Sequence, residues 1–179
     1  SIQGLGLSSV VPRVTSIVEH LVQHQLKVPF VNVTSELDLG LEVRCDNPQS
    51  VGADRLCNAV SGYRRYGGPL VVVDFGTATT FDVISEDGGY LGGIIAPGPE
   101  TTIATLHAAA AKLPTVELLF PQSLIGKNTE SSMQSGIMFG GVAMIDGLNR
   151  QLKQELGTNT RIIATGGLAN AFFPQLETV

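Results

Sequence analysis

Asp74 is the residue of this chain that most directly suggests chemistry, because it ends an apolar run and begins a polar turn. The stretch VVVDFGTATTFDVI, residues 71–84, combines a strand pattern, a carboxylate, a glycine and three threonines before a second strand. An ionised carboxylate at the end of a buried strand is costly unless it is paired, hydrated or bound to a cation. Gly76 allows a ligand to approach the backbone, and Thr77 adds a hydroxyl beside the turn amides. The stretch suggests an anion site next to a cation; a plain hairpin in which Asp74 caps local amides is the alternative.

A second candidate is the tetrad Gly52, Ala53, Asp54 and Arg55, which stands where a helix is expected to begin. The carboxylate could accept a proton, and the adjacent guanidinium could hold an anionic substrate. In the simpler interpretation, the acid only stabilises the helix dipole, by roughly 0.3–1 kcal/mol, and the arginine is solvated. Taken alone, the tetrad favours the simpler interpretation.

Two further motifs lie at predicted helix starts. IGKNT, residues 125–129, precedes a long helix, so that Asn128 or Thr129 either caps this helix or presents donors to a ligand. ATGGLA, residues 164–169, turns a strand into a helix through paired glycines. Such a turn allows either close approach of a nucleotide or tight internal packing.

The composition restricts the class of protein. The 179 residues are 43% hydrophobic and 15% charged, with a formal net charge of −5. This content is enough for a core, and the negative charge argues against a dedicated binder of nucleic acid or anionic membranes. No apolar run approaches the roughly 18 residues of a membrane span. Cys45 and Cys57 lack zinc-site spacing and are expected to be reduced thiols of a cytosolic protein.

The pattern of apolar residues predicts two groups of elements. The first group is a strand near the start, a helix from Pro12 with apolar residues at 14, 17, 18, 21 and 22, and a strand in PFVNV, followed by a polar connection over 34–49. The second group begins with a helix over 52–66, capped by Ser50 and ended by Gly67. After it come strands at 70–74, 79–84 and 90–96 with a hairpin at 86–89, helices over 100–113 and 130–156, a strand at 161–165 and a further helix start.

This order indicates an α/β fold in which a meander of strands is extended by parallel pairing. The opening strand, helix and strand resemble the end of the same kind of unit. We therefore expect residues 1–48 to be the remainder of a first unit and residues 49–179 to form a second one. Both ends look cut, so the chain is expected to be a fragment with an incomplete first unit. In the long helix, Gly136, Gly140, Gly141 and Ala143 suggest close internal packing or a dimer interface.

Together, the motifs resemble one family. In chain order, DNPQSVGADR, VVDFGTATTFDVI, YLGGIIAPG, AAKLP, IGKNT followed by SMQSGI, and ATGGLA are similar to type III pantothenate kinase. The resemblance implies an actin-like ATPase fold of two ribonuclease H-like units and ATP-dependent phosphorylation of pantothenate, the first step of coenzyme A synthesis. It also implies a cytoplasmic homodimer that uses ATP with Mg²⁺ and a monovalent cation, K⁺ or NH₄⁺.

The resemblance also implies roles for individual residues. Asp54 matches the family's proton acceptor and lies within its substrate-binding tetrad, residues 52–55. Asp74 matches the ligand of the monovalent cation. Thr77, with Gly76, matches a contact with ATP, and Thr129 matches a contact with the substrate. Cys45 departs from the family, whose members commonly carry at this position a Tyr that touches the substrate. The family's opening Asp-Gly-Asn-Thr phosphate loop is also missing, so the fragment alone is not expected to hold ATP productively.

Two other functions fit the same fold. One is a sugar kinase of the same superfold, and the other is a non-catalytic regulator, because some relatives of the family act as accessory factors in transcription. The presence of Asp54, Asp74 and Thr77 favours the enzyme.

Overall fold

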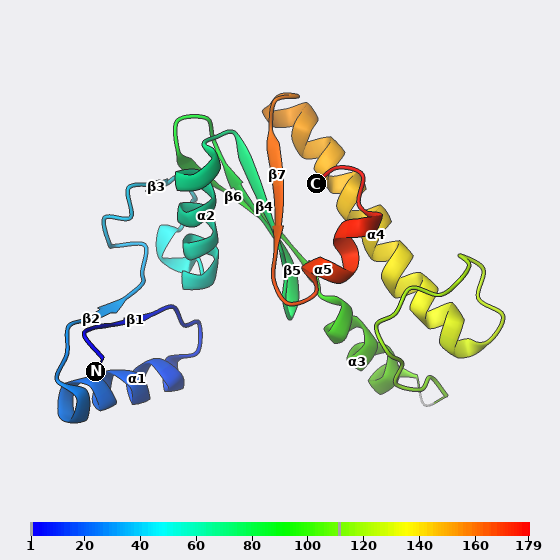
Figure 1. The fold of residues 1–179 in the computed structure, drawn as a ribbon, viewed down its shortest axis with the longest axis horizontal. Coiled ribbons are helices and arrows are strands. Elements are labelled where there is room, and N and C mark those ends of the chain that lie inside the picture. The colour runs from blue at the N-terminus through cyan, green and yellow to red at the C-terminus, as the bar shows by residue number, and fades with distance from the viewer. Residues whose placement is uncertain (1, 111) are drawn as a thin grey trace.

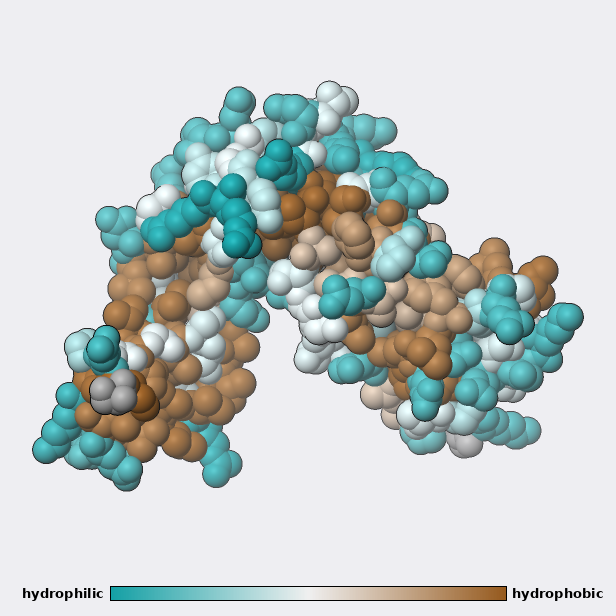
Figure 2. Space-filling model, in the orientation of Figure 1, coloured by the Kyte–Doolittle hydropathy of each residue, from teal (hydrophilic) through white to brown (hydrophobic). Residues whose placement is uncertain are grey.

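The computed structural model describes residues 2–110 and 112–179 and contains two sheets (Figure 1). In the smaller one, β1 (Leu5–Leu7) pairs in parallel with β2 (Phe30–Asn32). They are connected through α1 (Pro12–Leu21) and a π-helical turn, Val22–Leu26. The helix predicted from Pro12 is confirmed, but its apolar stripe lies mostly at the surface. Val14 and Ile17 are 45% and 59% exposed, and Figure 2 shows apolar side chains on this part of the molecule.

The larger sheet has five strands in the order β3-β6-β5-β4-β7. They are β3 (Glu42–Val43), β4 (Leu70–Phe75), β5 (Ala78–Ile84), β6 (Gly89–Pro97) and β7 (Arg161–Thr165). The pairs β4–β5 and β5–β6 are antiparallel, whereas β7 is parallel to β4 and β3 is parallel to β6. The predicted meander with an added parallel strand is thus confirmed. The strand β3 lies inside the stretch 34–49, which was wrongly expected to be only a connection.

Helices cover both faces of this sheet (Figure 1). They are α2 (Ala53–Tyr66), α3 (Pro99–Ala109), α4 (Thr129–Leu156) and the short α5 (Ala169–Phe172). One face packs against α2 through a cluster that includes Leu70, Val72 and Tyr90. The other face packs Val71, Val73 and neighbouring strand residues against α3, α4 and α5. Because both faces are buried, β4 reads as a continuous apolar run until Asp74.

The ends of α2 and α4 follow from their sequences. Gly52, not Ser50, is the N-cap of α2, because Ser50 belongs to a preceding 3₁₀ turn, Pro48–Ser50. Gly67 ends α2 with a φ of 72°, a conformation that favours glycine. Asn128 caps α4 through a reciprocal capping box with Ser131, which decides between the two predicted caps. The helix α3 ends at Ala109, earlier than the expected residue 113.

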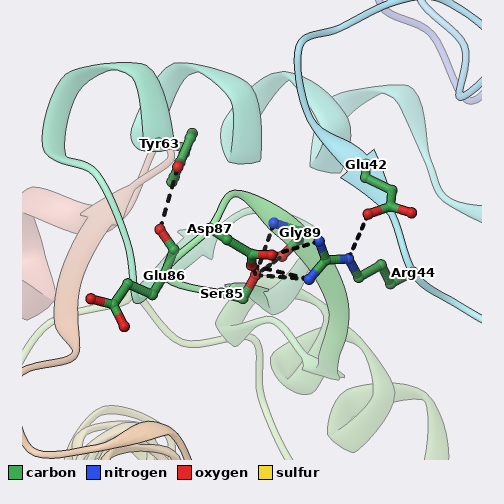
Figure 3. A network of polar contacts seen from close by, with 7 residues as sticks. All are labelled: Glu42, Arg44, Tyr63, Ser85, Glu86, Asp87 and Gly89. Carbon is green, nitrogen blue, oxygen red and sulfur yellow. Dashed lines mark hydrogen bonds and ion pairs between the residues drawn. The ribbon is translucent and has the colours of Figure 1, made fainter.

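A network of polar contacts fixes β3 against the β5–β6 hairpin (Figure 3). Arg44 donates to Glu42 at 2.7 Å and makes two bonds to Asp87, at 3.0 and 2.8 Å. Donors from Arg44 and Ser85 hold the pKa of the Asp87 carboxyl well below its usual range. Tyr63 of α2 contacts the same turn by donating to the Glu86 carbonyl at 3.3 Å. The network thus joins the segment just before Cys45 to the hairpin, and this segment leads into α2.

Candidate active site

The first half of α2 lies over the end of β4, and one hydrogen bond joins the two elements there. Asn58 Nδ2 donates to Asp74 Oδ2 at 2.7 Å. Asn58 follows Asp54 by four residues, and residues at this spacing lie on the same face of a helix. Asp54 is exposed and Asp74 is half-buried. The two predicted carboxylates therefore lie on the same side of α2, one on the helix and the other on the strand beneath it.

The β4–β5 turn is held in place from outside. Gly98 N and the Thr101 hydroxyl both donate to the Thr77 carbonyl, at 3.1 and 2.6 Å. Gly76 N donates across the turn to Ala78 at 3.1 Å, while the Thr77 side chain is exposed. Asp74 accepts from the side chain of Asn58, whereas the hairpin alternative expected it to cap local amides. The turn thus has a fixed backbone and an exposed hydroxyl three residues after the carboxylate.

Gly166 brings the end of β7 into contact with this turn. It has a φ of +96°, and a Cβ there would lie 2.6 Å from Phe75 N and 2.7 Å from Phe75 O, with Asp74 Oδ1 nearer still. At Gly167, in contrast, a Cβ would meet nothing within 4 Å. The first glycine of ATGGLA is therefore needed for packing, whereas the second faces open space beside the candidate site.

Arg55 is the centre of a cluster that the sequence did not predict. Its Nε donates to Asp82 Oδ1 at 2.7 Å, and its Nη2 donates to the Phe81 carbonyl at 3.2 Å. The Tyr90 hydroxyl donates to the same Asp82 oxygen at 2.9 Å. The Asp82 side chain has no exposed surface, and that of Arg55 is 16% exposed. The solvated Arg55 of the simpler interpretation is therefore wrong.

Burial controls the charge state of this cluster. It raises the pKa of Asp82 to about 6, although Arg55 and Tyr90 act in the opposite direction. Burial, followed by the charge of Asp82, also raises the pKa of Tyr90. Cys45 lies at the edge of the cluster, where burial raises the pKa of its thiol and Arg55 opposes this change. Cys45 and Cys57 are both free thiols. The sequence signal for the cluster is an acid, Asp82, placed between the apolar residues Phe81 and Val83 of a strand.

Thr129 is the predicted site residue that the structure places elsewhere. It is the first residue of α4 and is exposed. Figure 1 shows the start of α4 at the far end of the molecule from α2. Asp54 and Arg55 thus lie in the first turn of α2, the helix whose Asn58 contacts Asp74. Thr77 lies in the turn that follows β4, and Thr129 lies apart at the start of α4.

A cavity of about 200 Å³ lies on the opposite face of the sheet, between the β4–β5 region and α4. Its walls include Thr79, Pro97, Gly136 and Gly140. A Cβ at either of these two glycines would meet nothing within 4 Å, whereas one at Gly141 would lie 2.9 Å from the Phe172 ring. Gly141 therefore serves internal packing, whereas Gly136 and Gly140 face open space.

A three-strand antiparallel meander with an added parallel strand, and an Asp-Phe-Gly-Thr turn at the end of its first strand, defines a protein of the actin-like ATPase fold. A crystal structure from Campylobacter jejuni, of a conserved protein described as a Baf family transcriptional activator, shares this fold with a TM-score of 0.62. It is 23% identical, and the match covers 99% of this chain and 75% of that one.

The sequence comparisons identify the family. Residues 1–151 match the family described as type III pantothenate kinase. The protein of that name from Moorella thermoacetica is 47% identical over 178 residues, which cover 99% of this chain and 70% of the relative. Its counterpart from Thermomicrobium roseum is 48% identical over 171 residues, which cover 96% of this chain and 66% of the relative. The chain belongs to the type III pantothenate kinase family, the ATP-dependent kinases of pantothenate in coenzyme A biosynthesis.

Proposed function

We propose that Asp54 accepts the proton of the primary hydroxyl of pantothenate while this hydroxyl attacks the γ-phosphorus of ATP. The observation that carries the proposal is the Asn58–Asp74 hydrogen bond, because it sets the exposed Asp54 carboxylate on the same side of α2 as the Asp74 turn. Asp54 Oδ1 accepts from the amide of Arg55 at 2.8 Å, which orients the carboxylate and leaves Oδ2 for the substrate. Phosphoryl transfer mainly requires such positioning and charge neutralisation.

Within the substrate-binding tetrad, we assign Gly52 and Ala53 to the approach of the substrate and Arg55 to its carboxylate. A Cβ at Gly52 would lie only 2.5 Å from Asp54 Oδ1, so the glycine keeps space beside the proton acceptor. Arg55 is the cation nearest in sequence, and a guanidinium binds a carboxylate through two parallel hydrogen bonds. Thr77 and the Gly76 backbone would contact the phosphates of ATP.

Asp74 fits a monovalent cation such as K⁺ or NH₄⁺. Its Oδ2 is occupied by Asn58, while among the described residues no N–H or O–H group donates to Oδ1. Oδ1 lies at the close approach of Gly166 and the Phe75 backbone, so a carboxylate oxygen and a strand-end carbonyl are near one another. Oxygen ligands of this kind suit hard cations. Such a cation would neutralise charge on the phosphates, and the Mg²⁺ carried with ATP would do the same.

Thr129 and the homodimer are proposed together. Within one protomer Thr129 lies far from Asp54, so its contact with pantothenate requires Thr129 of a second copy. The exposed Thr129 and the open faces of Gly136 and Gly140 lie along the same helix, which offers a surface for close approach. Mixing the Asp54→Asn and Thr129→Ala proteins should then restore activity that neither has alone. Failure of the mixture, with dimers present, would place the substrate contact within one protomer.

We propose the division into residues 1–48, the end of a first ribonuclease H-like unit, and residues 49–179, the unit with the substrate and cation sites. No helix among the described residues is long and apolar enough to cross a membrane. A cytoplasmic location is proposed because coenzyme A synthesis consumes ATP. Turnover of pantothenate but not of hexoses would exclude the sugar-kinase alternative, and turnover of neither would favour the regulator.

The direct test is Asp54→Asn in the full-length enzyme. The kcat should fall by at least about 100-fold, the usual contribution of a general base, because the amide cannot accept the proton. The matched control is Glu100→Gln, which removes another acid from the first turn of a helix, α3. Both substitutions should change the free energy of unfolding by no more than about 1 kcal/mol. Turnover of Asp54→Asn close to that of the control would remove Asp54 from the role of base.

A further inference from the structure

We propose that Asp82 and Tyr90, with the space left by Gly93, form a rigid cradle that orients Arg55 toward the carboxylate of pantothenate. Asp82 and Tyr90 are thus positioning residues that determine specificity for an acidic substrate. This inference rests on the proposed role of Arg55 and adds residues that do not touch the substrate themselves.

Arg55 is held along one edge of its guanidinium group. A guanidinium has five N–H groups in a fixed plane. The hydrogen bonds to Asp82 and to the Phe81 carbonyl use Nε and Nη2, the two nitrogens on one edge. Among the described residues no acceptor contacts Nη1. The edge formed by Nη1 and Nη2 is therefore left for a ligand, and this edge can bind a carboxylate through two hydrogen bonds.

The cradle is built into the middle of the larger sheet. Asp82 lies in β5 directly opposite Val72 of β4 and Gly93 of β6, in the middle of the sheet. A Cβ at Gly93 would lie 2.6 Å from Arg55 Nη2 and would also collide with the Phe81 carbonyl. The Arg55 side chain can lie along the sheet only because residue 93 has no side chain. The guanidinium carbon of Arg55 also lies over the Tyr90 ring, 6.0 Å from the ring centroid.

The stability of the core does not require a charged pair at this position. Asp82 Oδ2 is buried and has no hydrogen-bond partner among the described residues. A buried ion pair with such an unpaired oxygen is weak evidence for stability, and apolar residues of similar volume often serve as well. The charged pair is better explained by orientation of Arg55, since Asp54, the proposed base, is the adjacent residue in the same helical turn.

The test compares two substrates of the full-length enzyme: pantothenate and its primary amide, in which a neutral carboxamide replaces the carboxylate. Asp82→Asn keeps the shape of the side chain but removes its charge. It should lower kcat/KM for pantothenate at least about tenfold, as expected for loss of a charged hydrogen bond, with the change mainly in KM. For the amide, kcat/KM should change by less than about threefold, because no carboxylate needs alignment.

Two further variants show whether Asp82 acts through Arg55. Arg55→Lys keeps the charge but loses the fork, and it should reduce the preference for pantothenate as Asp82→Asn does. The double variant should lose little more than either single variant, because both changes remove one interaction. Tyr90→Phe should lose part of the preference, and it tests the cradle even if Asp82→Asn does not fold. Asp146→Asn, which changes a buried carboxylate of α4, is the control and should leave the preference unchanged.

The outcomes separate the two proposals. If Arg55→Lys leaves the preference for pantothenate intact, the assignment of Arg55 to the substrate carboxylate is wrong, and the cradle loses its purpose. If Arg55→Lys reduces the preference while Asp82→Asn and Tyr90→Phe lower turnover of both substrates equally, only the cradle is wrong. Additive effects of Arg55→Lys and Asp82→Asn would also overturn it.

Discussion

Replacing Gly166 by alanine tests whether the contact between β7 and the Asp74 turn is as tight as the structure shows. The φ of Gly166 is +96°, so an alanine there is strained, at a cost of about 1–3 kcal/mol. The new Cβ would also lie 2.6 and 2.7 Å from the N and O atoms of Phe75. Because these backbone atoms belong to a central strand, they cannot move without shifting β4. Overpacking of this kind adds about 1–3 kcal/mol.

Gly67→Ala is the matched control. The φ of Gly67 is +72°, so it is also in a conformation that favours glycine, but a Cβ there would meet nothing within 4 Å. It should therefore pay only the cost of backbone strain, about 1–3 kcal/mol. The difference between the two variants isolates the collision with Phe75 and Asp74, and it should be about 1–3 kcal/mol.

Urea unfolding at 25 °C measures both losses, with the m-value checked for constancy. A second measurement follows K⁺ activation of the full-length enzyme, because the same Cβ would displace Asp74 Oδ1. Gly166→Ala should need more K⁺ for half-maximal activity, whereas Gly67→Ala should not. Equal losses of stability in the two variants, within about 0.5 kcal/mol, would refute the close contact.

Three further predictions concern Asp74, Asp82 and the glycines of α4. Asp74→Ala should abolish stimulation of turnover by K⁺, and an unchanged K⁺ dependence would refute the cation assignment. Burial raises the pKa of Asp82 from 3.8 to about 6, so the folded protein binds a proton between these values that the unfolded chain releases. Its contribution to the free energy of unfolding should therefore fall by about 2 kcal/mol as the pH rises from about 4 to 6, because each of these pH values lies near the midpoint of one of the two titrations. Urea unfolding of Asp82→Asn should lack this decrease, and an equal slope in both proteins would contradict the shift. Gly140→Ala and Gly147→Ala should each raise the melting temperature of the monomer, because alanine is more favourable than glycine in a helix by about 1 kcal/mol. Only Gly140→Ala should weaken a dimer, as measured by analytical ultracentrifugation.

Much of the fold could be predicted from local patterns. Gly67 ends α2, the stretch 86–89 makes the hairpin and RIIAT makes β7, because turn residues and apolar periodicity act within a few positions. The two-residue β3 was missed because a strand this short has no detectable alternation. The surface position of Val14 and Ile17 was also not predictable, since periodicity shows that a helix has an apolar face but not what covers it.

The amino-acid sequence by itself determined the family, the order of most helices and strands, and the identity of Asp54, Arg55 and Asp74 as candidates. Only the tertiary structure decided which side chains meet: that Asn58 holds Asp74 and that Asp82 holds Arg55. These partners are 16 and 27 positions apart in the chain. Their contacts depend on how α2 lies across the sheet and on the register of β5, and no local periodicity encodes either. The charged residues of a site can therefore be recognised from its motifs, whereas the orientation of their side chains is set by packing between distant segments.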